Sequence, residues 1–161
     1  MSNLAQTYEQ DFYAWITRNT ELLRQGKVEE IDALHLAEEL ESMGRRERHE
    51  LVSRFKILLG HLLKWQFQPL HRSSSWRGPI LEQRLQIRDL LAFNPSTKPF
   101  IPESMIVAYP AAVQLAEKET GLSQMSFPQA CPYTFEQALD DDFFPENSCL
   151  RVPADQPGSR D

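Results

Sequence analysis

The feature that most constrains the fold is a long run of apolar residues at helical spacing in the middle of the chain. From residue 51 to 65 these side chains recur every three or four positions: Leu51, Val52, Phe55, Leu58, Leu59, Leu62, Leu63 and Trp65. This spacing is typical of an amphipathic helix, and the width of the stripe predicts neighbours on two sides. Pro69 predicts that the helix ends near Gln68, because proline lacks the backbone N–H that a helix needs.

Capping signals predict further helices on both sides of this one. The residues Thr7-Tyr8-Glu9-Gln10 form a possible capping box, and Gly26 suits the left-handed position after a helix, so we expect a helix over about 8–25. Three more are expected after Pro69: one after Ser75 as its N-cap and ending before Asn94, one from the start signals in 96–102 to Thr120, and a short one after the capping box Thr134–Gln137.

The pattern does not show directly where the helix that begins after Asp32 ends. Its apolar positions recur at helical spacing as far as Met43, and a polar run follows. In one uninterrupted helix, Glu47 and Arg48 would fall on or near the apolar stripe, and burying them unpaired would be costly. We therefore predict a break or kink at Gly44, after which the helix resumes.

These patterns predict an all-α protein. No stretch alternates polar and apolar residues as a strand does, and the 161 residues include only 6 Gly. Short connections favour antiparallel neighbours, so we expect an up-and-down bundle of about five main helices plus a short C-terminal helix. We expect one domain over 1–145, and a disordered tail over 146–161 because that stretch is polar and rich in proline.

Charge is distributed unevenly along the chain. Residues 1–44 hold 3 basic and 9 acidic residues, residues 45–88 hold 10 and 3, and residues 89–161 hold 4 and 11. Either the basic middle is neutralised by acidic neighbours inside the fold, or it forms a basic face for nucleic acid or another anion. We favour internal neutralisation, because a dedicated nucleic-acid binder usually has a strongly basic domain.

Most signatures of catalysis or cofactor binding are absent from the sequence. It contains no phosphate-binding glycine loop, dinucleotide fingerprint or serine elbow. Two cysteines are too few for a disulfide scaffold or a four-cysteine zinc site, and only Asp32–His35 resembles half of a di-metal motif. We expect no cofactor and no metal. No apolar run reaches the roughly 20 residues of a membrane span, so we expect no membrane partner.

Polar residues set against apolar stripes are the remaining candidates for a site. They are His61, Arg72, Trp76, Arg77, Arg84 and Glu39. They have two interpretations. One is a hydrogen-bonded structural cluster, which is the commoner role of a buried histidine or arginine. The other is an anion site, since guanidinium groups suit phosphate and carboxylate, and the serines 73–75 would add donors at a helix N-terminus.

Of these residues, Arg84 leads to the most specific structural prediction. It lies between Ile80 and Ile87 on an apolar helix face, so we expect it to be buried. A buried guanidinium needs partners because arginine does not lose its proton in proteins. We predict a pair with at least one carboxylate from residues 38–50, with His61 and Arg77 close by.

Several blocks of the sequence resemble a known bacterial family. They are Asp11–Trp15, Leu36–Gly44, Gly60–Trp65, Pro69, His71-Arg72, Ser75–Arg77, Ile80, Glu82–Arg84, Cys131–Thr134 and Phe143–Pro145. In this order they are similar to the family called domain of unknown function 29, over about residues 8–145. Arg46 departs from the small capping residue expected there. The resemblance implies a bacterial, cytoplasmic, helical domain, and it implies no activity, cofactor or catalytic residue.

Three functions are compatible with this sequence. We favour a small cytoplasmic interaction or regulatory module whose partner is a protein. The first alternative is a nucleic-acid-binding protein that uses the basic segment 45–88. The second is an enzyme with an anion-binding site near Arg72, Trp76 and Arg84. An exposed basic stripe would favour the first alternative, and a concave pocket holding His61 and the arginines would favour the second.

Overall fold

The computed structural model describes residues 3–146 of the chain. Within that range it has six α-helices and short 3-10 segments, and the described residues contain no strand. This confirms the predicted all-α class with five main helices and a short C-terminal one. In the described part, no helix has both the length and the apolar character needed to cross a membrane.

Contacts within the chain divide it into two compact units, residues 1–47 and residues 48–161. The single domain expected over 1–145 stays a prediction. The tail expected over 146–161 lies outside the described residues, apart from Glu146. Each unit is therefore described by itself.

The first unit contains two short helices where the sequence predicted one. They are α1 (Leu4–Gln10) and α2 (Phe12–Arg24), and the 3-10 segment Val28–Glu30 follows them. The predicted helix over 8–25 was wrong because Asp11 leaves the helical conformation and caps α2, accepting the Ala14 N–H at 3.0 Å. Thr7 lies inside α1, where its hydroxyl donates to the Asn3 carbonyl, so it forms no capping box.

Helix α3 (Ala33–Phe67) runs without interruption, and the predicted break at Gly44 is absent. Both Glu47 and Arg48 are exposed, so the uninterrupted helix has no cost of burying their charges. None of the residues from 37 to 49 is buried, whereas from Leu51 onward the helix contributes most of its stripe to the core. The physical premise of the predicted break, burial of the whole stripe, was therefore wrong.

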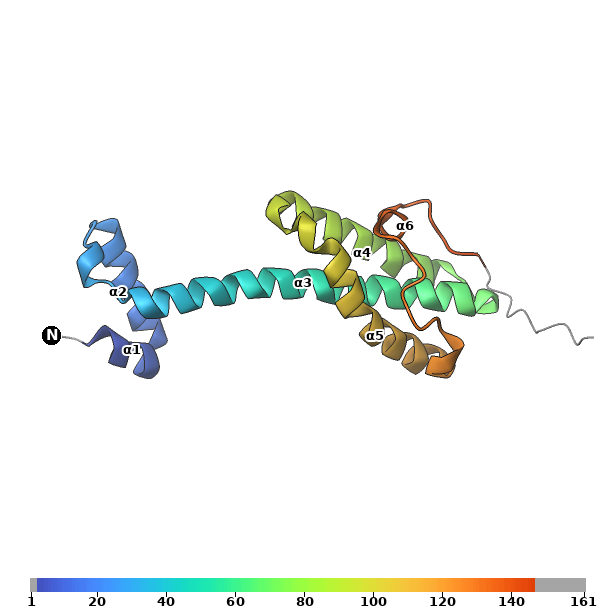
Figure 1. Cartoon of the computed structure of the whole chain (residues 1–161), viewed down its shortest axis with the longest axis horizontal. Coiled ribbons are helices and arrows are strands. Elements are labelled where there is room, and N and C mark those ends of the chain that lie inside the picture. The colour runs from blue at the N-terminus through green and yellow to red at the C-terminus, as the bar shows by residue number, and fades with distance from the viewer. Residues whose placement is uncertain (1–2, 147–161) are drawn as a thin grey trace, which may run out of the picture. The chain divides into compact units, whose positions relative to one another are not determined.

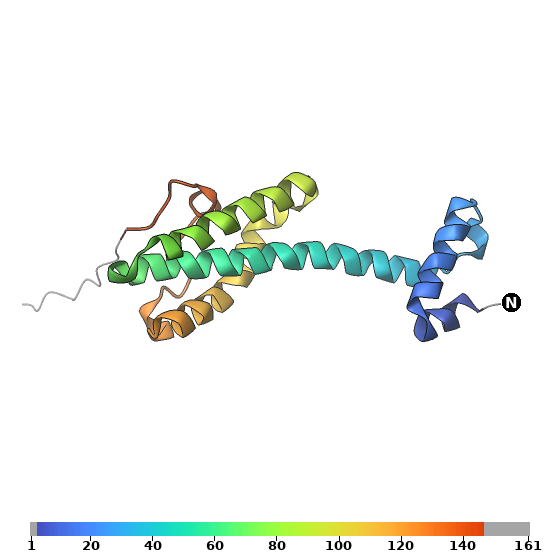
Figure 2. The same ribbon diagram turned by 180° about the vertical axis from the view of Figure 1, so that it is seen from behind.

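The second unit packs the later part of α3 with α4 (Ser74–Phe93) and α5 (Ile101–Thr120), as Figures 1 and 2 show from opposite sides. Short 3-10 segments connect these helices, at Pro69–His71 and Pro95–Phe100, and a third, Gln124–Ser126, follows α5. The core contains, among others, Phe55, Leu58, Leu62, Ile80, Ile87, Met105 and Ala112.

Gly60 allows α3 and α5 to approach closely. A Cβ at this position would lie 2.5 Å from Leu115 Cδ2 and 3.3 Å from the Ala112 carbonyl oxygen. After α5, Gly121 adopts the left-handed conformation that was expected of it, with φ of 74°. The chain then returns across the unit and forms α6 (Phe135–Leu139), which the predicted capping box of Thr134 and Gln137 begins.

Candidate functional site

The six predicted site residues do not share one unit. Glu39 lies on the part of α3 that belongs to the first unit, and its carboxylate accepts the Tyr8 hydroxyl at 2.7 Å. The other five, His61, Arg72, Trp76, Arg77 and Arg84, lie in the second unit. Within that unit the arginines gather around the C-terminal segment of the described chain, and His61 and Trp76 are each near Lys64.

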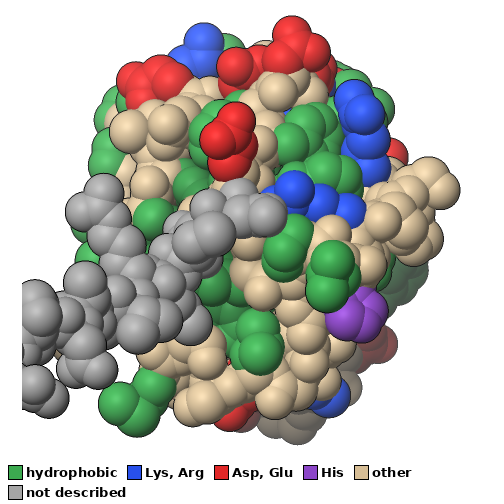
Figure 3. Space-filling view, turned by 90° about the vertical axis from the view of Figure 1, so that its right-hand side faces the viewer, with side chains coloured by type: hydrophobic (Ala, Val, Ile, Leu, Met, Phe, Trp, Pro, Cys, Tyr) green, Lys and Arg blue, Asp and Glu red, His purple; other side chains and the backbone are tan. Residues whose placement is uncertain are grey.

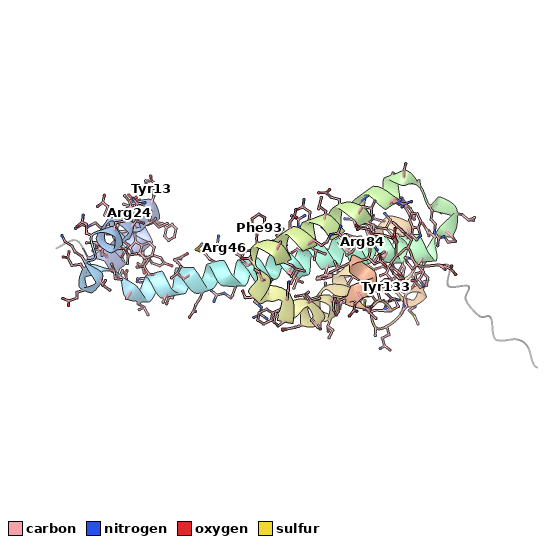
Figure 4. The ribbon with its side chains drawn as sticks, turned by 90° about the horizontal axis from the view of Figure 1, so that it is seen from above. Tyr13, Arg24, Arg46, Arg84, Phe93 and Tyr133 are labelled. Carbon is pink, nitrogen blue, oxygen red and sulfur yellow. The ribbon has the colours of Figure 1, made fainter. Side chains whose placement is uncertain are left out.

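Arg84 is fully buried, as its place on the apolar face of α4 predicts. Its Nε donates to the Ala138 carbonyl at 2.8 Å and one Nη donates to the Phe143 carbonyl at 2.6 Å. The guanidinium also faces the Phe144 ring at 5.2 Å from the ring centroid. Figure 4 shows Arg84 within the densely packed side chains of this unit.

The predicted carboxylate partner of Arg84 from residues 38–50 was wrong. The described chain supplies two backbone carbonyls instead, and the other Nη is buried with no hydrogen-bond partner among the described residues. Burial lowers the pKa of Arg84, and the nearby charges of Asp141 and Asp140 act in the opposite direction. Carbonyl oxygens satisfy donors but do not neutralise a cation, so this charge is compensated only at a distance.

Three further arginines hold the same C-terminal segment. Arg72 donates to the Pro145 carbonyl at 3.3 Å and to the Trp65 carbonyl at 2.7 Å. Arg77 lies over the Phe144 ring, 4.7 Å from its centroid. Arg88 donates to the Leu139 carbonyl at 3.2 Å and to both carboxylate oxygens of Asp141 at 3.0 Å.

We call Arg72, Arg77, Arg84 and Arg88 the arginine row, and residues 138–145 the C-terminal segment. The sequence suggested Arg72, Arg77 and Arg84 as an anion site, and the structure shows that Arg72 and Arg84 donate to backbone carbonyls while Arg77 lies over the Phe144 ring. The spacing 77, 84 and 88 indicates a common face of one helix. No feature of the sequence indicated that residues more than 50 positions away would cover that face.

His61 and Trp76 belong to a second polar group, built around Lys64. The Lys64 ammonium is almost fully buried, donates to the Glu119 carboxylate and lies 4.6 Å from the centroid of the Trp76 ring. Burial lowers the pKa of His61, and Lys64 adds to this effect while Glu119 opposes it. Its Nδ1 is buried without a hydrogen-bond partner in the described part of the chain. Such an environment favours a neutral histidine.

The first unit contains a polar and aromatic cluster that the sequence analysis missed. Asp32 accepts the Trp15 indole N–H at 3.1 Å and lies 2.7 Å from His35 Nδ1. The His35 ring stacks on Tyr8 at 4.1 Å between centroids, and Asn19 accepts the Asp32 backbone N–H at 2.8 Å. The sequence signal that was available is the three-residue spacing of Asp32 and His35, which we considered only as half of a di-metal motif.

Within this cluster the Asp32 carboxyl group is ionised and the Tyr8 phenol is neutral. Burial opposes ionisation of Asp32, but hydrogen bonds from His35 and Trp15 outweigh it and lower the pKa of the carboxyl. The bond to Glu39 raises the pKa of Tyr8 to about 12, so the phenol stays neutral and donates. Asp32 also sits at the start of α3, where its Oδ1 lies 3.4 Å from the His35 backbone N–H. The cluster therefore joins α1 and α2 to the first turn of α3.

No group of three metal-binding side chains occurs among residues 3–146. Two surface hollows of the second unit, of about 340 and 560 Å³, are lined by residues outside the arginine row. The first lies between Lys56 and the 111–119 face of α5, and the second between Tyr109 and Phe127. Neither therefore joins His61 to the arginines in a concave pocket.

Comparison with known proteins gives one match. No curated protein and no solved structure matches the chain. The family model described as Domain of unknown function DUF29 matches residues 7–144, which is nearly all of the described chain. This agrees with the resemblance carried by the sequence blocks, several of which contribute to the sites above: Asp11–Trp15, Gly60–Trp65, Glu82–Arg84 and Phe143–Pro145. The chain therefore belongs to the family Domain of unknown function DUF29.

Proposed function

We propose that this chain is an interaction module whose partner is another protein. The observation that carries the proposal is that most cations of the basic segment 45–88 contact groups of the chain itself. Five of its cations have carboxylate partners, in the pairs Arg45–Glu41, Arg48–Glu103, Arg54–Glu50, Lys64–Glu119 and Arg88–Asp141. The arginine row holds the C-terminal segment, so most of these cations already contact groups of the chain itself.

Exposed apolar side chains give the proposal its second support. On α3, Leu40 is 65% exposed and Met43 is 56% exposed, in a stretch of helix that contributes nothing to a core. On the end of the second unit that Figure 3 shows, Lys and Arg side chains lie among hydrophobic ones. Surfaces of mixed apolar and charged character are typical of protein interfaces.

We also propose a cytoplasmic location in a bacterium. This rests on the family resemblance, and on the small number of cysteines, which suits a reducing compartment. A regulatory role within the same compartment is part of the proposal, with the bound protein as the regulated partner.

Photo-crosslinking in the native cell tests the proposed partner class. A benzophenone amino acid replaces Met43 in the full chain, and the matched control carries it at Glu38, which is also exposed on α3. We expect ultraviolet light to join the Met43 variant to a discrete protein and to give far less product with the control. The product should survive nuclease treatment.

The nucleic-acid alternative makes the opposite prediction in a binding assay. Non-specific DNA binders have dissociation constants of about 10⁻⁴–10⁻⁶ M at physiological salt, and their affinity falls steeply as salt rises. We expect the full chain to show no binding to random duplex DNA in that range. Salt-sensitive binding there, together with crosslinks that nuclease removes, would replace the protein partner with a nucleic acid.

A further inference from the structure

The C-terminal segment is held as a bound peptide would be. It has no regular secondary structure after α6 ends at Leu139, and it runs beside α4 (Figure 1). Its main hydrogen bonds to the rest of the unit run from guanidinium groups to backbone carbonyls, at Ala138, Leu139, Phe143 and Pro145. Because every peptide has these carbonyls, this part of the recognition does not depend on the sequence of the segment.

Ala138, Leu139 and Phe143 of the segment lie in or against the core, and two further side chains contact the arginine row itself. Both carboxylate oxygens of Asp141 accept from one nitrogen of Arg88, Nη2, at 3.0 Å, and these bonds are charge-assisted. Phe144 packs against the Trp65 ring at 4.9 Å between centroids and lies under the guanidinium groups of Arg77 and Arg84. The arginine row therefore recognises an acid followed three residues later by an aromatic ring.

The segment leaves part of the arginine row unsatisfied. One Nη of Arg84 is fully buried and has no hydrogen-bond partner in the described chain. The other bonds of Arg84 go to neutral carbonyls, so no carboxylate contacts this cation within hydrogen-bond distance. A ligand that brought a carboxylate to the free Nη would make a bond that the chain's own segment does not make.

We propose that the arginine row is a binding surface for an acidic and aromatic peptide segment of a partner protein, and that residues 138–145 are its internal occupant. The inference rests on the proposed interaction role and names the chemistry of the partner. The partner's segment would carry Asp or Glu three residues before Phe, Tyr or Trp, and it would compete with Asp141 and Phe144 for the same contacts. Regulation would follow from that competition.

The test uses the full chain and a fluorescein-labelled peptide with the sequence of residues 136–146, followed by fluorescence anisotropy. In the unmodified chain the internal segment competes, so we expect weak binding. The variant Phe144→Ala weakens the occupant through its ring contacts, and we expect it to bind the labelled peptide at least tenfold more tightly. A peptide lacking the Asp141 carboxylate and the Phe144 ring should bind at least tenfold more weakly to the same variant.

A pair of charge variants locates the site. Added to Phe144→Ala, Arg88→Met should weaken peptide binding at least fivefold, whereas Lys98→Met removes one exposed positive charge from outside the row and should leave it unchanged. If Phe144→Ala lowers the helical circular dichroism, Asp141→Asn provides a second way to weaken the occupant, since Asp141 is exposed. We expect Asp141→Asn to tighten binding of the labelled peptide, as Phe144→Ala does.

Two results would overturn the proposal. One is a folded Phe144→Ala or Asp141→Asn variant that binds no labelled peptide up to millimolar concentration. The other is equal binding of the peptide that lacks the acid and the ring. Either result, combined with a protein crosslinked at Met43, would leave the interaction role intact and remove the arginine row as its site. Peptide binding without any crosslinked protein would keep the arginine row as a peptide site and contradict the interaction role tested at Met43.

Discussion

In the first unit the partly buried carboxylate of Asp32 is held by ring donors at the start of a helix, whereas in the second unit the fully buried guanidinium of Arg84 is held by backbone carbonyls. The partners of Asp32 lie 3 and 17 residues away, and those of Arg84 lie 54 and 59 residues away. The first arrangement needs only two neighbouring helices. The second needs the chain to return across the finished bundle, so it depends on the whole unit.

The two units also differ in what surrounds the charge. In the first, the fully buried side chains are Trp15, Asn19 and Leu22, and rings of Tyr8 and His35 complete the cluster. In the second, residues of α3, α4, α5 and the chain that follows them bury a continuous hydrophobic core. The comparison suggests that packing stabilises the second unit, while hydrogen bonds of defined geometry carry a larger share in the first.

Helix α3 contributes to both units, and a matched pair of substitutions on it should give the largest contrast. Leu62 is fully buried, and Leu40 is 65% exposed. We expect Leu62→Ala to lower the free energy of unfolding by about 2–5 kcal/mol, because it leaves a cavity in the core. Leu40→Ala should change it by less than about 0.5 kcal/mol. Urea unfolding followed by circular dichroism measures both, and similar losses would contradict the difference between the two parts of α3.

The next largest effect concerns the buried guanidinium. Arg84→Met should lower the free energy of unfolding by about 2–3 kcal/mol, because each buried carbonyl left without a donor costs about 1–3 kcal/mol and the methionine partly fills the space. Arg46→Met is the control, since Arg46 is exposed on α3 (Figure 4) and should be nearly silent. A variant Arg84→Met as stable as the parent would show that the C-terminal segment needs no guanidinium to hold it.

A smaller loss is expected in the first unit. Asparagine caps helices about as well as aspartate, so Asp32→Asn keeps the cap and weakens mainly the bonds from Trp15 and His35. We expect a loss of about 1 kcal/mol in the free energy of unfolding, of the size of one ordinary net hydrogen bond. Asp11→Asn, at the exposed cap of α2, gives the background effect of such a change. Equal effects at both positions would mean that the cluster adds nothing beyond capping.

Acidification should lower the stability of the two units in different pH ranges. These are the smallest of the expected effects. The pKa of His61 is lowered in the folded chain, so its contribution is complete above the unfolded value of about 6.5 and is lost as the pH falls below it. The pKa of Asp32 is also lowered in the folded chain, so its contribution to stability is lost as the pH falls below about 3.9. Stability measured from pH 8 to 5 should decline shallowly, and His61→Gln should flatten that decline. A decline that His61→Gln leaves unchanged would assign it to other groups.

Local patterns predicted those features that local contacts create. The capping box of Thr134 and Gln137 forms, and Gly121 ends α5, because each involves residues at most four positions apart. The burial of Arg84 also followed from its place between Ile80 and Ile87. The split of the first predicted helix was missed because Thr7 and Asp11 both offer capping oxygens, and the pattern alone did not rank them.

From the sequence alone follow the helical class, the stripe that builds the core and the need of a buried arginine for partners, because periodicity and desolvation act wherever the chain is helical. Which atoms satisfy Arg84 depended on the tertiary structure. The same is true of the uninterrupted α3, since Glu47 and Arg48 remain exposed in the folded chain and the helix buries neither charge. Both outcomes depend on which surfaces become covered, and coverage is a property of segments far apart in the chain.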